Sequence, residues 1–199
     1  MDVQNFLRKL VGRKISIVGF ESFKLESAVI ALLRSLPNSI FIGNRSFDDV
    51  RGYIDSQAFN RDLRLRNILS NAPITLVVDM NTIYSNRPNQ PNAPITTSQD
   101  FQELILHLKQ KVFHNDYNIY TGAPLREINI IFLNKTYKSA INNTNTFRGG
   151  NRMLYICDFC VIFTETHVHI VKDRDGHKGK EKFNPIFFQR DMVLKGLLK

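Results

Sequence analysis

The chain has 199 residues and a formal net charge of +9 at pH 7. This length fits one domain and argues against two full domains. No apolar run approaches the ~18 residues of a membrane span, and the N-terminus lacks the apolar stretch of a secretion signal, so we expect a cytoplasmic protein without membrane contact. The excess of Lys and Arg makes polyanions the expected partners, because neutralising phosphates releases condensed counterions.

The first half of the chain alternates predicted helices and strands. A short helical pattern at residues 1–13 leads into a buried, β-branched strand at 14–20. Residues 25–36 follow as a packed helix, because their apolar side chains recur with a 3.6-residue period. A second strand covers 39–43. The segment 46–54 starts with a serine N-cap and has acidic residues in its first turn, which predicts another helix.

The middle of the chain contains two polar segments that each follow a predicted strand. A third strand covers 73–80, and the proline-rich segment 84–98 after it is predicted to be a mobile loop without regular structure. A helix is predicted over 98–112 and a fourth strand over 128–133. Residues 134–152 then form a second polar loop with several basic residues and no acid.

Three further predicted strands close the chain, at 157–165, 167–174 and 185–190, with the first two forming a hairpin. This order predicts an α/β fold with a mostly parallel central sheet flanked by helices and an antiparallel, β-rich C-terminal end. We expect a single domain over 1–199, divided into an N-terminal helix (1–13), a core (14–184) and a C-terminal strand or tail (185–199). Both polar loops follow strands, at the edge where open α/β sheets bind ligands.

The segment 128–176 resembles RecA-like proteins, meaning bacterial and phage strand-exchange recombinases and their replicative-helicase relatives. The family pattern is an apolar strand ending in Asn, a loop closed by Gly-Gly, a short helix, an apolar strand, and a strand with alternating basic residues. In this chain the pattern is carried by Asn134, Gly149 and Gly150, the segments NRMLYI and CDFCVIF, and Lys172 and Arg174. The resemblance implies a RecA-like, phosphate-loop-type fold over roughly residues 14–184.

The segment GFESFKL after the first strand resembles the phosphate loop of this family but departs from it. A phosphate loop needs glycines so that backbone N–H groups can face the phosphates, a lysine for the outer phosphates, and a hydroxyl for magnesium. Gly19 and Lys24 match the loop, whereas Phe23 stands at the second glycine and Leu25 at the hydroxyl. Glu21 adds a negative charge where phosphate oxygens would lie. The catalytic glutamate of the family has no counterpart after the second strand.

By resemblance, the remnant of a nucleotide site comprises Gly19, Lys24, Asp79 and Asn134. Lys24 is either a phosphate ligand or a surface lysine at the start of a helix. Asp79 is either a magnesium ligand or a polar strand end that makes structural hydrogen bonds. The missing hydroxyl and glutamate predict a protein without catalytic residues for ATP hydrolysis and without an ATP–magnesium cofactor, while weak nucleotide binding stays open.

The two polar loops are the predicted nucleic-acid surface, because the corresponding recombinase loops contact single-stranded DNA. Contacts of this kind position the strand through its phosphates without reading its sequence. Tyr137 and Phe147 would stack on bases. The alternative is a solvated loop that the glycines only terminate. By resemblance, the residues that would hold backbone phosphates are Arg87, Lys135, Lys138, Arg148, Gly149, Gly150, Asn151 and Arg152.

The basic residues near the C-terminus suggest a contact between subunits. Lys172 and Arg174 match a pair that, in recombinase filaments, reaches the nucleotide of the neighbouring subunit. Alternation along a strand puts both on one face, as that role requires. Lys178 is grouped with them as a predicted intersubunit residue, and a plain charged hairpin is the alternative.

A zinc site is weakly supported by the short distance in sequence between two cysteines and two histidines. Cys157 and Cys160 would point to opposite faces of an extended strand, so they could share one zinc ion only across a bend. His167 and His169 share a face, but two histidines alone make a weak site. We therefore expect no metal.

Three functions are consistent with the sequence. The first is a non-hydrolysing or weakly nucleotide-binding RecA-like protein that binds single-stranded DNA, or serves in a DNA replication, recombination or transcription assembly, and is encoded by a phage. The second is an active ATP-dependent recombinase or helicase motor with a divergent phosphate loop. The third is a protein-interaction scaffold that never contacts nucleic acid. Protein partners or self-assembly are expected as well.

Overall fold

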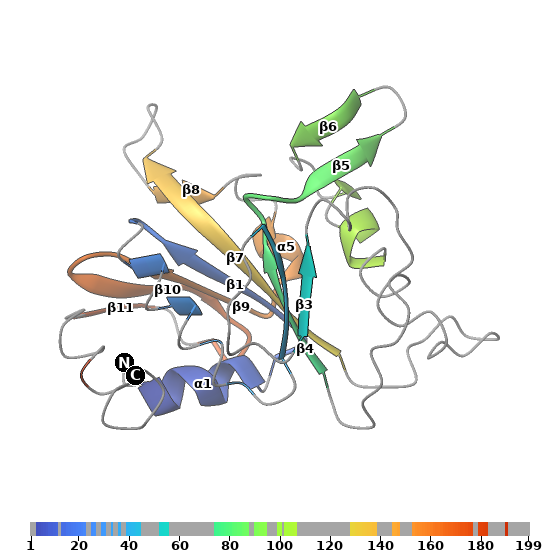
Figure 1. The fold of residues 1–199 in the computed structure, drawn as a ribbon. Coiled ribbons are helices and arrows are strands. Elements are labelled where there is room, and N and C mark those ends of the chain that lie inside the picture. The colour runs from blue at the N-terminus through green and yellow to red at the C-terminus, as the bar shows by residue number, and fades with distance from the viewer. Residues whose placement is uncertain are drawn as a thin grey trace.

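The computed structural model describes a subset of the chain (Figure 1), namely residues 3–11, 13–22, 25–26, 29–30, 33, 36, 39–44, 52–55, 74–87, 90–94, 99–100, 102–106, 128–138, 145–147, 153–176, 179–182 and 190. Its named elements are α1 (Val3–Val11), β1 (Ile15–Phe20), β2 (Ser39–Gly43), β3 (Gly52–Asp55), β4 (Ile74–Asp79), β5 (Tyr84–Arg87), β6 (Gln90–Pro94), β7 (Ile128–Lys138), β8 (Asn145–Phe147), α5 (Met153–Ile156), β9 (Phe159–Phe163), β10 (His167–Asp173) and β11 (Gly179–Lys182). Residues 99–100 and 102–106 are also helical.

Among the described residues, most strands belong to one mixed sheet in the order β11-β10-β9-β1-β7-β4-β2-β3, with β8 paired to β7. The strands from β9 to β3 in this order are parallel, while β10 and β11 are antiparallel to their neighbours. This arrangement confirms the predicted mostly parallel sheet with an antiparallel C-terminal end. The β9–β10 hairpin and the short helix before it are also as predicted.

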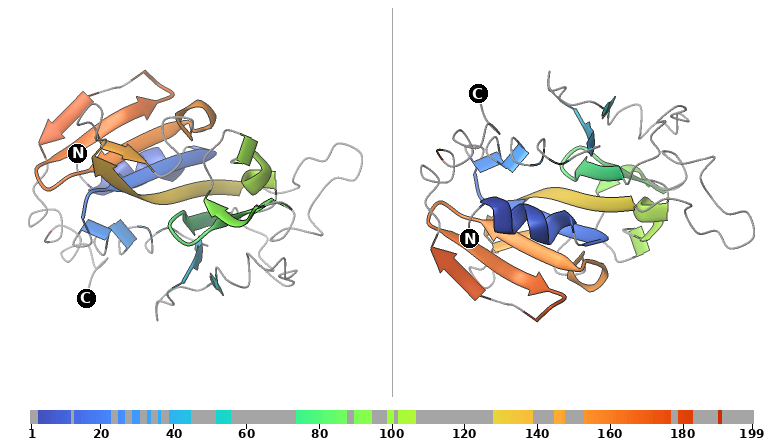
Figure 2. Two further views of the ribbon diagram at one scale, coloured as in Figure 1. Left: turned by 90° about the horizontal axis from the view of Figure 1, so that it is seen from above. Right: turned by 90° about the horizontal axis from the view of Figure 1, so that it is seen from below.

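The sheet has an apolar core on both faces. Along β9 the side chains alternate, so that Phe159, Val161 and Phe163 join one cluster and Cys160 and Ile162 the other. The first cluster is covered by α1, which lies over the strands when the molecule is seen from below (Figure 2), and by the helical residues Leu25, Val29, Ile30 and Leu33. The second is covered by α5 and by Leu104 of the helical segment 102–106.

One predicted helix is in part a strand. Residues 46–54 were expected to be helical, but Gly52–Asp55 form β3, which pairs in parallel with β2 at the edge of the sheet. The β-branched and aromatic pair Tyr53 and Ile54 suits an edge strand, and pairing with a buried neighbour overrides the local helix signals. The rest of the predicted helix lies outside the described residues.

The prediction that segment 84–98 has no regular structure was wrong, because β5 and β6 form an antiparallel hairpin within it. Each strand of a two-stranded hairpin pairs along one edge only. A proline is therefore tolerated at a position whose backbone nitrogen faces the other edge, because no hydrogen bond between the strands is lost. Pro91 and Pro94 stand opposite Asn86 and Tyr84, and the register shifts between Ser85 and Asn86.

The second polar loop is likewise shorter than predicted. The fourth strand was expected to end at residue 133, yet β7 continues to Lys138 and β8 pairs with its end, with Thr136 opposite Phe147. The β7–β8 and β5–β6 hairpins both project from the same end of the sheet (Figure 1).

At the C-terminal end of the chain, the strand after the β9–β10 hairpin is β11 at 179–182. The strand predicted at 185–190 lies outside the described residues except for Arg190, which is helical. In the part of the chain that the structure describes, no helix is long and apolar enough to cross a membrane.

Candidate functional site

Three of the four residues of the predicted nucleotide site lie at the carboxyl edge of the parallel strands. Gly19 of β1 stands directly opposite Asn134 of β7, and Asp79 of β4 stands opposite Leu133 on the other side of β7. The fold therefore brings Gly19, Asn134 and Asp79 together, as their positions near strand ends predict. Lys24 and Phe23 lie outside the described residues.

The sheet continues past Gly19 into the segment that follows β1. Phe20 is paired on both sides, its carbonyl accepts a bond from Thr136 Oγ1 at 3.3 Å, and the N–H of Glu21 donates to the Phe163 carbonyl at 3.0 Å. The Ser22 carbonyl then accepts bonds from the N–H groups of Leu25 and Glu26, both at 3.1 Å. The last hydrogen bond of the sheet, donated by the Glu21 N–H, and the first helical bonds, accepted by the Ser22 carbonyl, thus lie on adjacent residues. The Glu21 N–H is already used in the sheet.

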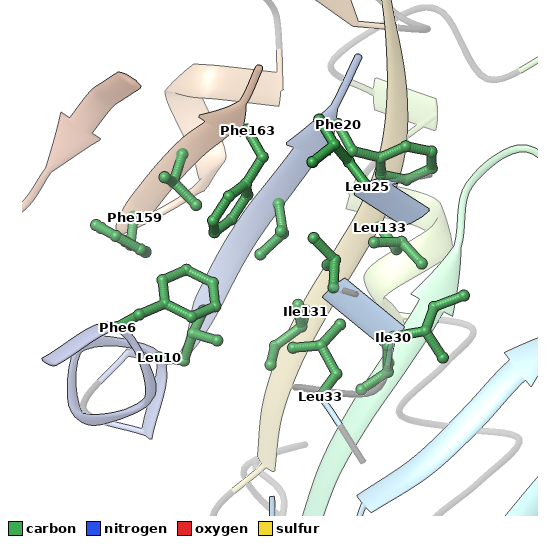
Figure 3. Close-up of a cluster of buried hydrophobic side chains, with 14 of the residues drawn as sticks. Phe6, Leu10, Phe20, Leu25, Ile30, Leu33, Ile131, Leu133, Phe159 and Phe163 are labelled. Atoms are coloured by element: carbon green, nitrogen blue, oxygen red, sulfur yellow. The ribbon is translucent and has the colours of Figure 1, made fainter. Parts of the chain in front are cut away.

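The side chains on either side of this turn are part of the apolar core. Phe20 is 1% exposed and Leu25 is 3% exposed, and both belong to the cluster under α1 and the helical residues after the turn. Figure 3 shows them beside Leu133 of β7. Leu25, which the sequence resemblance places at the hydroxyl position of a phosphate loop, thus packs into the protein interior.

Asp79 makes hydrogen bonds within its own turn. Its Oδ1 accepts bonds from the backbone N–H of Asn81 at 3.0 Å and from Asn81 Nδ2 at 2.8 Å. Its carbonyl accepts bonds from the N–H and the hydroxyl of Thr82, at 3.1 and 3.0 Å. These hydrogen bonds join residues 79–82 and hold the turn that leads to β5, and one oxygen of the Asp79 carboxylate takes part in them.

Asn134 is fully buried on the α5 side of the sheet, where its Nδ2 lies 3.5 Å from the Met153 sulfur. Met153 begins α5, directly after the segment that carries the Gly-Gly pair. Asn134 therefore connects the strand next to Gly19 with the end of the second polar segment.

Three of the predicted nucleic-acid residues, Arg87, Lys135 and Lys138, lie in strands that the structure describes. Lys135 lies in β7 opposite Phe20 and is half-buried, Lys138 ends β7 opposite Asn145, and Arg87 ends β5 opposite Gln90. The backbone positions of Tyr137 and Phe147 lie in the β7–β8 hairpin. Arg148, Gly149, Gly150, Asn151 and Arg152 lie outside the described residues.

Lys172 and Arg174 lie at the opposite, amino edge of the parallel strands, because β10 runs antiparallel to β9. The ammonium of Lys172 donates to the Leu154 carbonyl of α5. The N–H of exposed Arg174 donates to the Asp158 carbonyl at 2.9 Å. The register shifts between Ile170 and Lys172, and Arg174 follows the end of the strand, so simple alternation does not describe this segment. Lys178 lies outside the described residues.

An ionic cluster beside Arg174 was not predicted. Asp173, whose side chain is fully buried, lies 2.5 Å from Lys9 Nζ and 2.8 Å from the Arg13 guanidinium, which also bonds Asp175. Burial raises the pKa of Asp173, but the hydrogen bonds from Lys9 and Arg13 outweigh it and lower the pKa to about 2. Hydrogen bonds to Asp175 and Asp173 raise the pKa of Arg13. The sequence shows acidic and basic residues side by side in KDRD, but nothing in that run indicates Lys9 and Arg13 as the partners of Asp173.

The two cysteines do not lie on opposite faces of a strand as expected. Cys157 precedes β9, and both cysteines join the same apolar cluster. Burial raises the pKa of Cys157 to about 11 and that of Cys160 well above its usual value, so both thiols stay protonated at neutral pH. His169 is exposed, and His167 lies 2.8 Å from the Thr166 hydroxyl. Within the described ranges, no three His, Cys, Asp or Glu side chains are grouped as a metal site would require.

The strand order, the helices on both faces and the antiparallel C-terminal strands define a mixed α/β domain of the RecA-like fold class. Among solved structures, the chain is similar to the ATPase domain of a phage replicative helicase, with a TM-score of 0.51 and 8% sequence identity. The match covers 85% of this chain and 80% of that one. No family model and no curated protein matches the sequence. The likeness therefore lies in the fold and confirms the fold class predicted from the sequence.

Proposed function

We propose that this chain is a RecA-like domain that does not hydrolyse ATP, binds single-stranded nucleic acid at the carboxyl edge of its sheet, and serves as a subunit of a DNA replication, recombination or transcription assembly. The observation that supports the absence of ATP hydrolysis is the arrangement of the segment that follows β1. There the sheet continues to the N–H of Glu21, helical bonding begins at the Ser22 carbonyl, and Leu25 is buried in the core.

The physical argument concerns the groups that hold a triphosphate and its magnesium ion. A phosphate loop binds anions through successive backbone N–H groups that face the ligand, and it orders magnesium through a hydroxyl. In this chain the N–H of Glu21 is bonded to Phe163 and the side chain at position 25 is apolar. The Glu21 carboxylate would also repel a phosphate. These features support a site with weak or no triphosphate binding.

The nucleic-acid part of the proposal is supported by charge and by the two hairpins. The chain has a net charge of +9, and the β5–β6 and β7–β8 hairpins project from the same end of the sheet (Figure 1). Lys135 and Lys138 lie along β7 at this end. Projecting hairpins that carry Arg87 and Lys138 suit a flexible single strand, which can be held through its phosphates and stacked on aromatic rings.

The first test is ATP turnover with and without single-stranded DNA. We expect a rate below about 10⁻³ per second, unchanged by Lys24→Ala, because typical enzymes reach 1 per second or more only with charge stabilisation and an activated water. A rate near one per second that is lost in Lys24→Ala would instead establish the active motor. That alternative is favoured by the likeness to a domain described as an ATPase domain.

The second test is the binding of a fluorescein-labelled oligo(dT) across a salt series, followed by fluorescence anisotropy. We expect a Kd of roughly 10⁻⁶ to 10⁻⁴ M that rises as the salt concentration rises. In the double variant Arg148→Ala/Arg152→Ala, the affinity should depend less steeply on salt concentration, because two phosphate contacts are removed. Arg8→Ala/Lys14→Ala is the matched control, since both residues are exposed and Lys14 lies at the opposite edge of the sheet. Absence of binding at low salt, or equal slopes in the two double variants, would favour the protein-interaction scaffold.

A further inference from the structure

The N-terminal helix and the turn after β10 are joined by ion pairs between residues far apart in the sequence. Lys9 and Asp173 are 164 positions apart, and Arg13 and Asp173 are 160 apart. Arg13 also bonds Asp175, so one guanidinium connects two carboxylates of the same turn. The side chain of Asp173 is 0% exposed, whereas those of Lys9 and Arg13 are 23% and 13% exposed.

Aromatic packing between Phe6 and two rings of β9 also holds α1 against the sheet. The Phe6 ring meets the Phe163 ring edge-on at 5.2 Å between centroids and lies 6.4 Å from the Phe159 ring. Lys9 Nζ lies 5.8 Å from the centroid of the Phe159 ring. Phe6 and Leu10 thus dock the apolar side of α1 on the sheet (Figure 3), while Lys9 reaches Asp173.

Asp173 also organises the turn that follows it. Its Oδ1 accepts a bond from the N–H of Asp175 at 3.1 Å, and its carbonyl accepts one from the N–H of Gly176 at 2.9 Å. Gly176 has a φ of +85°, which favours glycine. Arg174 lies between Asp173 and Asp175 in the chain. It is exposed, and its backbone N–H donates a hydrogen bond to the Asp158 carbonyl.

We propose that α1 together with Arg13 is a releasable latch on the turn at residues 174–176. If the latch lifts, Asp173 loses both cations that neutralise it. A buried carboxylate without a counter-charge is strongly unfavourable, so the loss of both cations favours opening of the turn, which brings the Asp173 carboxylate to water. A partner that binds α1 only when it is lifted from the sheet would therefore favour opening of the turn, and one that binds Arg174 only in the opened turn would favour release of α1. This inference does not depend on whether the chain binds nucleotide or nucleic acid.

Amide hydrogen exchange by NMR on the full chain at neutral pH tests the latch. In Arg13→Ala and in Lys9→Met, we expect the amides of Arg174 and Gly176 to exchange roughly 10- to 100-fold faster, because each variant removes a charged hydrogen bond. Amides of β1 and β7 are the internal reference and should change less than about twofold if the opening is local. Arg8→Ala is the matched control, since Arg8 is an exposed neighbour on the same helix.

Conservative variants separate a latch from general support of the fold. Arg13→Lys and Lys9→Arg keep a cation facing Asp173 and should restore most of the protection of the Arg174 and Gly176 amides. Two results would overturn the proposal. One is unchanged exchange at these amides in both Arg13→Ala and Lys9→Met. The other is equal acceleration in the turn and in β1, which would mean that the ion pairs stabilise only the whole fold.

Discussion

Leu25→Ser is expected to lower the free energy of unfolding by about 3 to 5 kcal/mol and not to create a phosphate loop. The substitution supplies the hydroxyl that a magnesium-binding loop needs, but Leu25 is only 3% exposed and packs in the cluster with Phe20 and Leu133. Removing this side chain leaves a cavity, and the new hydroxyl must be buried. Urea unfolding followed by circular dichroism measures the loss.

Leu106→Ser is the matched control for this prediction. Leu106 is 51% exposed, so the same chemical change should cost less than about 1 kcal/mol. A Leu25→Ser protein that keeps its stability and gains ATP binding would contradict the assignment of Leu25 to the core. It would also weaken the proposal that the turn no longer holds a triphosphate.

Acid is expected to remove about 2 kcal/mol of stability through Asp173 alone. The pKa of this carboxyl is about 2 in the folded chain, compared with an ordinary value of 3.8. Because the folded pKa is the lower one, the stabilisation is fully present above the ordinary value and is lost as pH falls from about 4 through about 2. Urea unfolding at a series of pH values between 7 and 2 measures this loss.

Asp173→Asn tests the assignment of that acid-sensitive component. The variant should be about 2 kcal/mol less stable than the parent chain at pH 7. Most of this difference should be gone near pH 2, because the Asp173 carboxyl is then about half protonated in the folded parent and almost fully protonated in the unfolded chain. Glu103→Gln is the matched control, since it removes the charge of an acidic residue that is exposed and does not contact Asp173. Parallel stability curves for the parent and Asp173→Asn down to pH 2 would refute the role given to Asp173.

Much of the candidate site followed from local pattern. Gly19, Asp79 and Asn134 lie near the ends of apolar strands in the sequence, and parallel strands place such ends at one edge of a sheet, so their meeting was predictable. The placement of Lys172 and Arg174 was harder to predict. A register shift and the end of β10 interrupt the alternation of side chains between the two faces of the strand.

The sequence by itself determined which segments are buried on both faces and in what order they occur, because continuous apolar runs such as those of β1, β7 and β9 can be stable only inside a covered sheet. Only the tertiary structure decided that Gly52–Asp55 pairs as a strand and that the proline-rich segment forms a hairpin. It also decided that Leu25 enters the core and that Asp173 meets Lys9 and Arg13. These outcomes depend on which distant surfaces meet, and a pairing partner or a buried counter-charge leaves no periodic trace in the local sequence.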